Sequence, residues 1–266
     1  MTAAPPLAQR LNVVEHRSCR EIRTDLPVVA LHGIGGSAGS CAPLAERLAA
    51  SGFSTWCVDA PGYGNSADPS PGDDVVSTVV DLLTSRWPGR AVILVGTSWG
   101  GVIATAVALR NPECVAALVL ADSTRGSGTT PDKARAMRAR IDDLRDRGAE
   151  AVAADRADRL LAPTADAAVA ETVRRSMAAV REPGFAAAAE FMATTDHGAV
   201  LNRIDRPTMV LVGEHDVITG VDESRLLAEN IPGAEFAVIP DAGHVAIQEQ
   251  PDRIADLIIE FIGRLS

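Results

Sequence analysis

Short apolar runs alternate along this chain with longer helix-like segments, and this alternation limits the fold more than any other feature. Each run is rich in Val, Ile and Leu and ends near a turn residue. Strands that are buried on both faces of a parallel sheet have this composition. The runs span residues 27–31, 54–58, 91–95, 115–120, 208–212 and 234–239.

Helical patterns fill most of the intervals between these runs. They cover residues 41–50, 73–86, 99–110 and 250–265, and two of them stop just before a proline. Alternating strands and helices predict an α/β fold, in which helices flank a mostly parallel, doubly wound sheet with right-handed crossovers. A weak alternation in residues 11–24 predicts an antiparallel hairpin at one edge of the sheet.

Residues 123–205 interrupt the rhythm because they contain no convincing strand. They are rich in Ala, Arg and Asp, with helical periodicity in residues 132–147 and 165–181. A structureless loop of this length would be unusual in a compact domain. We therefore predict a helical cap at 123–205, over the carboxyl ends of the strands of a core formed by 1–122 and 206–266.

Composition excludes several classes of partner. The formal net charge of -10 disfavours nucleic acids and anionic membrane surfaces. No apolar run approaches the roughly 18 residues of a membrane span, and residues 1–10 do not resemble a secretory signal. The four cysteines lack metal-binding spacing. We expect a cytoplasmic protein with reduced thiols and no bound metal.

The pentapeptide Gly96-Thr97-Ser98-Trp99-Gly100 lies between a predicted strand and a predicted helix. A serine at such a sharp turn stands clear of the sheet, and larger residues two positions before or after it would collide. The pattern G-x-S-x-G is weak alone but much more specific in this context. Ser98 is therefore the candidate nucleophile.

A serine hydroxyl needs a base, and a histidine with a carboxylate partner can supply one. In this kind of fold the acid and then the histidine follow the serine along the chain. Asp216 follows the run at 208–212, and His244 follows the run at 234–239. Asp122, after the run at 115–120, is the alternative acid.

The oxyanion of the tetrahedral intermediate requires two backbone N–H donors. One is expected from Trp99, the residue after the nucleophile, and the other from the glycine-rich turn that follows the first parallel strand. Ile34 is the preferred donor there, with Gly35 as the alternative, while His32 braces the turn. The turn contains neither GxGxxG nor GK[ST], so a nucleotide site is not expected.

The sequence resembles the α/β-hydrolase superfamily along nearly its whole length, and within it the 3-oxoadipate enol-lactonase group. The motifs that carry this resemblance are HGIGGS at His32, DAPGYGNS at Asp59, GTSWGG at Gly96, GEHD at Gly213 and DAGH at Asp241. The resemblance implies hydrolysis of a small ester or lactone without a cofactor. Trp99 departs from the small or aliphatic residues common at this position in the lactonase group.

An anionic lactone would require a cation in the pocket. Arg125 is the candidate, with Arg135 and Arg138 on the first cap helix as further ones. Gly33 and Gly35 are expected to border the substrate, and Met137 to contribute an apolar contact.

Two other functions remain open on the same residues. One is hydrolysis of a carbon–carbon bond in a vinylogous diketone, a ring-cleavage product, and the other is a non-catalytic receptor for a small ligand. The expected partner is a small molecule, and homodimer formation is left open. The sequence names neither the substrate nor the pathway.

Overall fold

The structure, a computed structural model, describes residues 6–21 and 24–265. A seven-stranded sheet with the order β1-β3-β2-β4-β5-β6-β7 forms its centre. β1 runs antiparallel to β3, and all other neighbouring strands are parallel. The strands are β1 (Val13–His16), β2 (Val28–Leu31), β3 (Thr55–Val58), β4 (Val92–Thr97), β5 (Val115–Ala121), β6 (Thr208–Gly213) and β7 (Glu235–Ile239).

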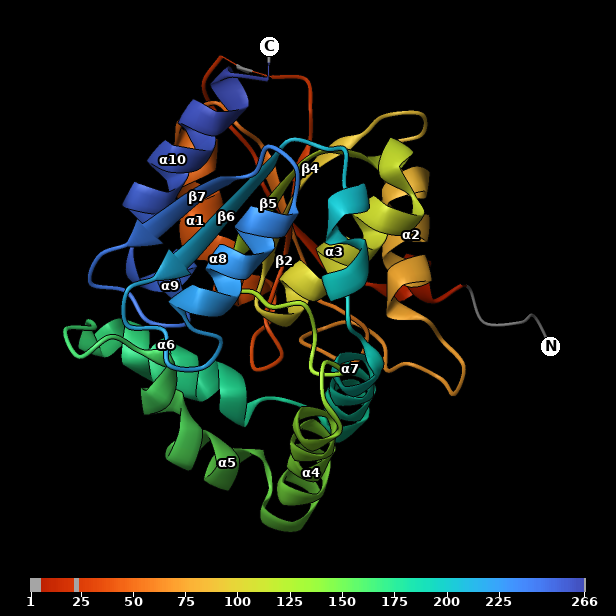
Figure 1. Ribbon diagram of the computed structural model, residues 1–266, viewed down its shortest axis with the longest axis vertical. Helices are drawn as coiled ribbons and strands as arrows, with labels where there is room; N and C mark the ends of the chain where they lie inside the picture. The colour runs from red at the N-terminus through yellow and green to blue at the C-terminus, as the bar shows by residue number, and fades with distance from the viewer. Residues whose placement is uncertain (1–5, 22–23, 266) are drawn as a thin grey trace.

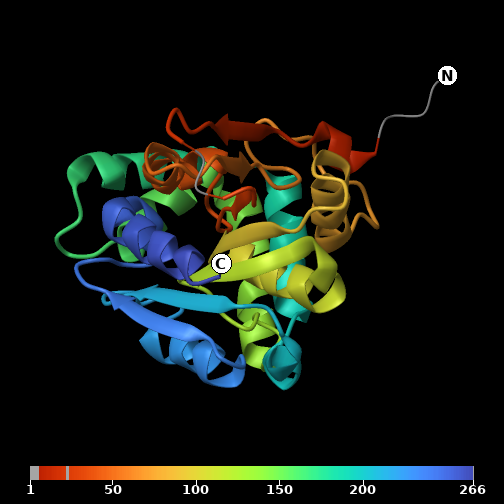
Figure 2. The same cartoon turned by 90° about the horizontal axis from the view of Figure 1, so that it is seen from above.

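Helices cover both faces of this sheet (Figures 1 and 2). α1 and α10, with the short α9, pack on one face, and α2, α3 and α8 pack on the other. The helices are α1 (Ala38–Ala50), α2 (Val75–Arg86), α3 (Trp99–Arg110), α4 (Pro131–Arg147), α5 (Ala149–Arg156), α6 (Ala167–Ala178), α7 (Glu182–Thr194), α8 (Val221–Asn230), α9 (Ala246–Glu249) and α10 (Pro251–Gly263).

Short 3₁₀ helices complete the secondary structure, at η1 (Leu7–Arg10), η2 (Pro112–Cys114), η3 (Ala157–Leu160) and η4 (Gly198–Arg203). The central strands β2, β4 and β6 are buried along their whole length. Because no face of these strands meets water, their sequences read as continuous apolar runs and not as alternating ones. The predicted α/β class and mostly parallel sheet are confirmed.

The helix α3 is enclosed on all sides. Its first ten residues are buried, because it lies between the sheet, α2 and the cap helix α7. Side chains such as Val102 and Ile103 are almost wholly shielded from water, and burying each contributes about 1.5–3 kcal/mol. This packing fixes the N-terminus of α3, where Ser98 lies.

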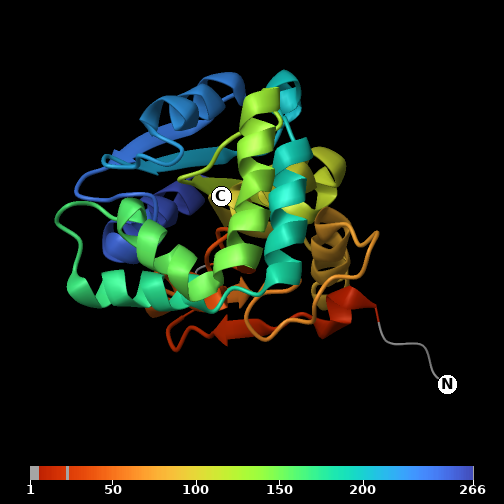
Figure 3. The same ribbon diagram turned by 90° about the horizontal axis from the view of Figure 1, so that it is seen from below.

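The chain between β5 and β6 forms four helices, α4 to α7, that lie together at one end of the sheet (Figures 1 and 3). α4 packs along α7, and α5 packs along α6. α4 matches the helix expected at 132–147, and α6 is shorter than the one expected at 165–181, while α5 and α7 were not expected. These helices lie across the carboxyl ends of the parallel strands.

The edge of the sheet differs from the expected hairpin. β1 is a single strand that pairs with β3, and residues 17–21 and 24 form no second strand. The partner of β1 therefore comes from a distant part of the sequence, which local alternation cannot reveal. Residues 22–23 of the predicted hairpin, and 1–5 of the segment searched for a signal, lie outside the described residues.

Candidate active site

Ser98 occupies a strained turn between β4 and α3. Its φ of 53° and ψ of -119° are unfavourable for a residue with a side chain and cost on the order of 1–3 kcal/mol. The Ser98 N–H donates to the Ala121 carbonyl at 2.9 Å, and the buried helix α3 holds the other side of the turn. The surrounding structure thus maintains the strain and presents the hydroxyl at the end of the sheet.

Glycines around Ser98 allow this turn to pack closely. A Cβ on Gly96 would lie 2.4 Å from the Gly100 carbonyl oxygen, and one on Gly100 would lie 2.3 Å from the Leu31 carbonyl oxygen. A Cβ on Gly101 would lie 2.3 Å from the hydroxyl of Ser123. These are the collisions expected from the sequence, and they involve backbone atoms at the first two positions.

Ser98, His244 and Asp216 form a hydrogen-bonded chain. Ser98 Oγ lies 2.9 Å from His244 Nε2, and His244 Nδ1 lies 3.0 Å from Asp216 Oδ2. With its proton on Nδ1, the imidazole donates to the carboxylate and accepts from the serine hydroxyl. His244 and Asp216 are each only 6% exposed, so water screens the pair weakly.

Asp216 receives further hydrogen bonds from the loop that follows β6. The N–H groups of Ile218 and Thr219 donate to Oδ1 at 2.8 and 3.1 Å, and the Thr219 hydroxyl donates to Oδ2 at 2.6 Å. Burial alone would raise the pKa of Asp216, but the interactions with His244 and these donors outweigh it and lower the pKa to about 2. Asp216 therefore carries a negative charge beside the imidazole at neutral pH.

The alternative acid, Asp122, has a different set of partners. Its two carboxylate oxygens accept the N–H groups of Gly213 at 2.8 Å and Ala246 at 3.0 Å. It is fully buried, and burial raises its pKa to about 7. Asp216, and not Asp122, is hydrogen-bonded to His244. Asp122 instead joins the ends of β5 and β6 to α9.

The glycine-rich turn after β2 lies against the nucleophile. A Cβ on Gly33 would be 3.2 Å from Ser98 Cβ. His32 is buried and braces this turn, because its Nδ1 lies 2.8 Å from the Gly33 carbonyl oxygen and its Nε2 accepts the Ala60 N–H. Trp99 is the first residue of α3, so its N–H has no acceptor within the helix. The amides of Ile34 and Trp99 remain the predicted oxyanion donors.

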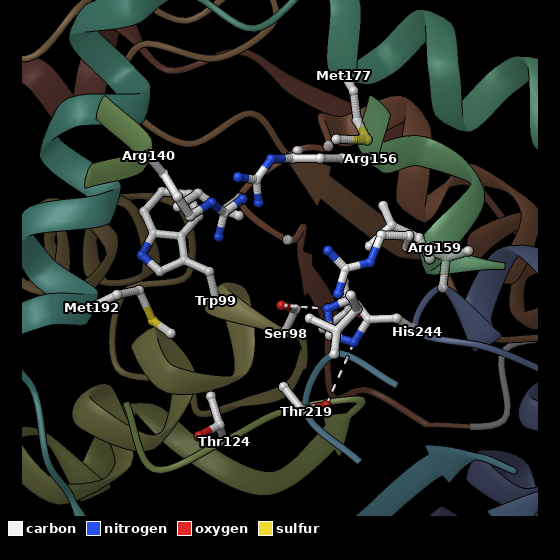
Figure 4. A pocket seen from close by; sticks show the side chains of 18 of the residues that line it. Ser98, Trp99, Thr124, Arg140, Arg156, Arg159, Met177, Met192, Thr219 and His244 are labelled. Atoms are coloured by element: carbon white, nitrogen blue, oxygen red, sulfur yellow. Dashed lines mark hydrogen bonds between the residues drawn. The ribbon is translucent and has the colours of Figure 1, made fainter. Parts of the chain in front are cut away.

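A cavity of about 510 Å³ lies in front of Ser98, between the sheet and the helices α4 to α7. Gly33, Gly35 and Met137, which are predicted to contact the substrate, border this cavity, and so does Ile34. Met177 and Met192 add further apolar surface (Figure 4). No three His, Cys, Asp or Glu side chains gather into a metal-binding group in the part of the chain that the structure describes.

Comparison with known proteins agrees with this geometry. Residues 27–251 match the family model of the alpha/beta hydrolase fold. The chain belongs to this family. It is 31% identical over 225 residues to the pimeloyl-[acyl-carrier protein] methyl ester esterase of Chromobacterium violaceum, across 82% of this chain and 86% of that protein.

Two further relatives support the assignment. The 3-oxoadipate enol-lactonase 2 of Acinetobacter baylyi is 27% identical and covers 73% of each chain. The structure of a thermophilic esterase from Thermogutta terrifontis superposes with a TM-score of 0.85, at 28% identity, over 96% of this chain and 93% of that one. The resemblance inferred from the motifs is thus confirmed, and the protein is a hydrolase.

Arg125, the cation predicted to bind an anionic substrate of this α/β-hydrolase, pairs with an acid of the protein instead. Arg125 does not border the cavity; its Nε and Nη2 donate to Glu223 at 2.9 and 3.2 Å. Arg135 and Arg138 are exposed on α4 and pair with acids on the surface. The expectation for Arg125 is corrected because Glu223, on α8, lies within reach and neutralises it.

Other cations of the hydrolase border the cavity instead, namely Lys133, Arg140, Arg156 and Arg159. Figure 4 shows the three arginines. Arg140 lies three residues after Met137 on α4, so a helical projection from Met137 would have indicated it. Thr219, the third donor to Asp216, was also missed. No helix falls within the described residues that is long and apolar enough to cross a bilayer.

Proposed function

We propose that this α/β-hydrolase cleaves a small carboxylic ester or lactone through an acyl-enzyme on Ser98. The observation that carries the proposal is the hydrogen-bonded chain from Ser98 through His244 to Asp216, beside a cavity large enough for a small substrate. A hydroxyl so placed can transfer its proton to the imidazole as it attacks a carbonyl carbon.

The reaction proceeds in two acyl-transfer steps. Ser98 attacks the ester carbonyl while His244 accepts its proton, and the amides of Ile34 and Trp99 bind the developing oxyanion. His244 then protonates the departing oxygen and afterwards activates water, which releases the acid and regenerates the serine. Asp216 stabilises the imidazolium that forms in each step. Losing one oxyanion donor typically costs about 2.7–4 kcal/mol of transition-state stabilisation.

The names of the relatives support this class of substrate. Two of the three are esterases and the third is a lactonase. Esters and lactones share an acyl carbonyl bonded to a leaving oxygen. That shared chemistry is the part of their activity that we extend to this chain.

The test is the release of p-nitrophenol from p-nitrophenyl acetate and butyrate by the purified protein. We expect turnover that falls by at least about 10⁴-fold in Ser98→Ala, because removing the nucleophile of a triad has effects of this order or larger. Ser85→Ala is the matched control, since this serine is exposed on α2. Circular dichroism and thermal melting establish that each variant is folded.

Equal turnover in the wild type and Ser98→Ala would refute the acyl-enzyme. If the folded wild type leaves both esters intact, the two remaining functions are tested directly. Bleaching of a coloured dienol substrate would assign carbon–carbon hydrolysis. Saturable binding of a small molecule without turnover would assign a receptor.

A further inference from the structure

The cap side of the cavity carries positive charge that the protein does not balance. Lys133, Arg140, Arg156 and Arg159 border the cavity, although the whole chain has a formal net charge of -10. Glu223 is the acidic residue among the described lining residues, and it is already paired with Arg125. The local excess of cations is therefore opposite in sign to the molecule as a whole.

Arg140 shows this imbalance most clearly. Its Nε is buried and has no hydrogen-bond partner among the described residues. Its Nη1 lies 3.6 Å from the sulfur of Met137, a weak acceptor, and its guanidinium lies 5.4 Å from the ring centroid of Phe185. No described acid forms an ion pair with it. Arg140 as a whole is half-buried, but a guanidinium nitrogen that is shielded from water and lacks an acceptor is costly, so a ligand that supplies an anion would be favoured.

Two more arginines flank the same space. Arg156, the last residue of α5, reaches Asp143 only at 3.5 Å and shares that acid with Arg147. Arg159, on η3, has no ion-pair partner within the described residues. Figure 4 shows the side chains of Arg140, Arg156 and Arg159 pointing into the cavity that contains Ser98.

The charge of Arg156 also acts on Arg140. Burial, reinforced by the charge of Arg156, lowers the pKa of Arg140 to about 10. Arg140 remains protonated at neutral pH, so the repulsion persists in the empty cavity. A negative charge placed among these side chains would relieve the repulsion and satisfy unpaired donors at once.

We propose that Arg140, Arg156 and Arg159, the arginine cluster, bind a free carboxylate on the substrate. The substrate is then an ester or lactone with a second, ionised carboxyl group, such as the monoester of a short dicarboxylic acid. This inference rests on the proposed ester hydrolysis for its catalytic half. The planar, forked guanidinium donors suit a carboxylate, and the methionine-lined surface suits the alkyl chain that joins its two carboxyl groups.

A purely structural role for Arg140 is the competing explanation. Its guanidinium lies over the ring of Phe185, on α7, and α7 packs along α4, which carries Arg140. Methionine at position 140 would retain most of the apolar stem of the arginine and remove the charge. A test with Arg140→Met therefore separates the two roles.

The kinetic test compares monomethyl adipate with methyl hexanoate, which has the same chain length but no charge, by following methanol release. We expect the wild type to prefer the anionic ester by at least about tenfold in kcat/KM, and Arg140→Met to reduce this preference about 10- to 100-fold, as loss of a charged hydrogen bond would. Arg156→Met should reduce it in the same direction.

Arg138→Met is the matched control, because Arg138 lies on the same helix but pairs with Glu190 at the surface. The preference of Arg138→Met for monomethyl adipate over methyl hexanoate should stay within about twofold of the wild-type value, as for other surface substitutions. A wild type without preference for the anionic ester would overturn the proposal. So would an equal change of preference in Arg140→Met and Arg138→Met.

A binding test does not depend on turnover. Adipate is titrated by calorimetry into Ser98→Ala, alone and combined with Arg140→Met or Arg138→Met. We expect binding that weakens at least about tenfold with Arg140→Met only. Adipate binding by Ser98→Ala, together with a wild type that cleaves no ester, would preserve the subsite and refute the proposed function. Ester cleavage without adipate binding, or binding of inorganic phosphate in its place, would refute the carboxylate subsite alone.

Discussion

Asp122 and Asp216 have the same side chain and both follow buried strands, yet their environments give them opposite electrostatic properties. Asp216 accepts three hydrogen bonds from its own loop and contacts His244, and its pKa falls to about 2. Asp122 is fully buried between backbone amides, and its pKa rises to about 7. The partner of each carboxylate, and not its position after a strand, decides its role.

We therefore predict different consequences for the two asparagine substitutions. Asp216→Asn should lower kcat by about 10⁴-fold, since a neutral amide neither fixes the required tautomer nor stabilises the imidazolium. Asp122→Asn should destabilise the fold by about 1–3 kcal/mol, because its amide nitrogen would face a backbone N–H. Steady-state kinetics and urea unfolding of both variants test this. A larger loss of kcat in folded Asp122→Asn than in Asp216→Asn would contradict the assignment.

Single residues were predictable where the backbone determines their place. Ser98 follows β4 directly and His244 lies in the loop after β7, so the order of strands brings them together. Asp216 was predicted as the acid, with Asp122 as the alternative, because both follow strands. The paths of their loops decide which one reaches the imidazole, and Asp216 is the one hydrogen-bonded to it. Arg125 was predicted to face the substrate, but a partner from α8, distant in sequence, neutralises it.

At the scale of elements, α9 links the cap to the loop that carries His244. The Glu249 carboxylate accepts the N–H of Ala162, beyond η3, and the N–H of Gly243, both at 2.7 Å. The His244 N–H donates to the Leu160 carbonyl at 2.7 Å. The cap therefore helps to hold the imidazole in place as well as enclosing the cavity.

Glu249→Gln should disturb this link, because a glutamine offers one acceptor oxygen where two amides need acceptors. We expect a loss of about 1–3 kcal/mol of stability, together with a several-fold fall in kcat and a smaller change in KM. Kinetics at a temperature well below the melting point separate the two effects. Glu260→Gln, on the exposed surface of α10, is the control and should change neither. Unaltered kcat in Glu249→Gln would show that the link is structural only.

The sequence predicted the buried strands well, because helices on both faces make each one a continuous apolar run. It predicted the edge less well, since β1 pairs with β3 across a long separation in sequence. The helix α8 was missed, although Asp222 and Glu223 in its first turn are typical of a helix start. The packing of the cap helices depends on side-chain contacts that periodicity does not specify.

For the whole molecule, the buried carboxyl groups of Asp216 and Asp122 make the free energy of unfolding depend on pH in two separate ranges. Asp216 has a folded pKa of about 2, below the ordinary value near 3.9, so its contribution is present above about pH 4 and is lost as the pH falls toward 2. Asp122 has a folded pKa of about 7, so the native state retains a proton that the unfolded chain releases. The stability that this retained proton contributes is fully present below about pH 4 and is lost as the pH rises to 7.

We predict that the free energy of unfolding of the wild type, relative to Asp122→Asn, decreases between pH 4 and pH 7. The slope is at most about 1.4 kcal/mol per pH unit, because only one proton is involved and asparagine cannot bind it. Urea unfolding of both proteins at several pH values measures this difference. Subtracting the free energy of unfolding of the variant cancels the contributions of groups that titrate alike in both proteins. A difference that stays constant over this range would mean that Asp122 is ionised throughout, held by the two amides of Gly213 and Ala246. A falling difference would mean that burial outweighs those two hydrogen bonds, and that the molecule holds a neutral carboxyl group beside its charged one.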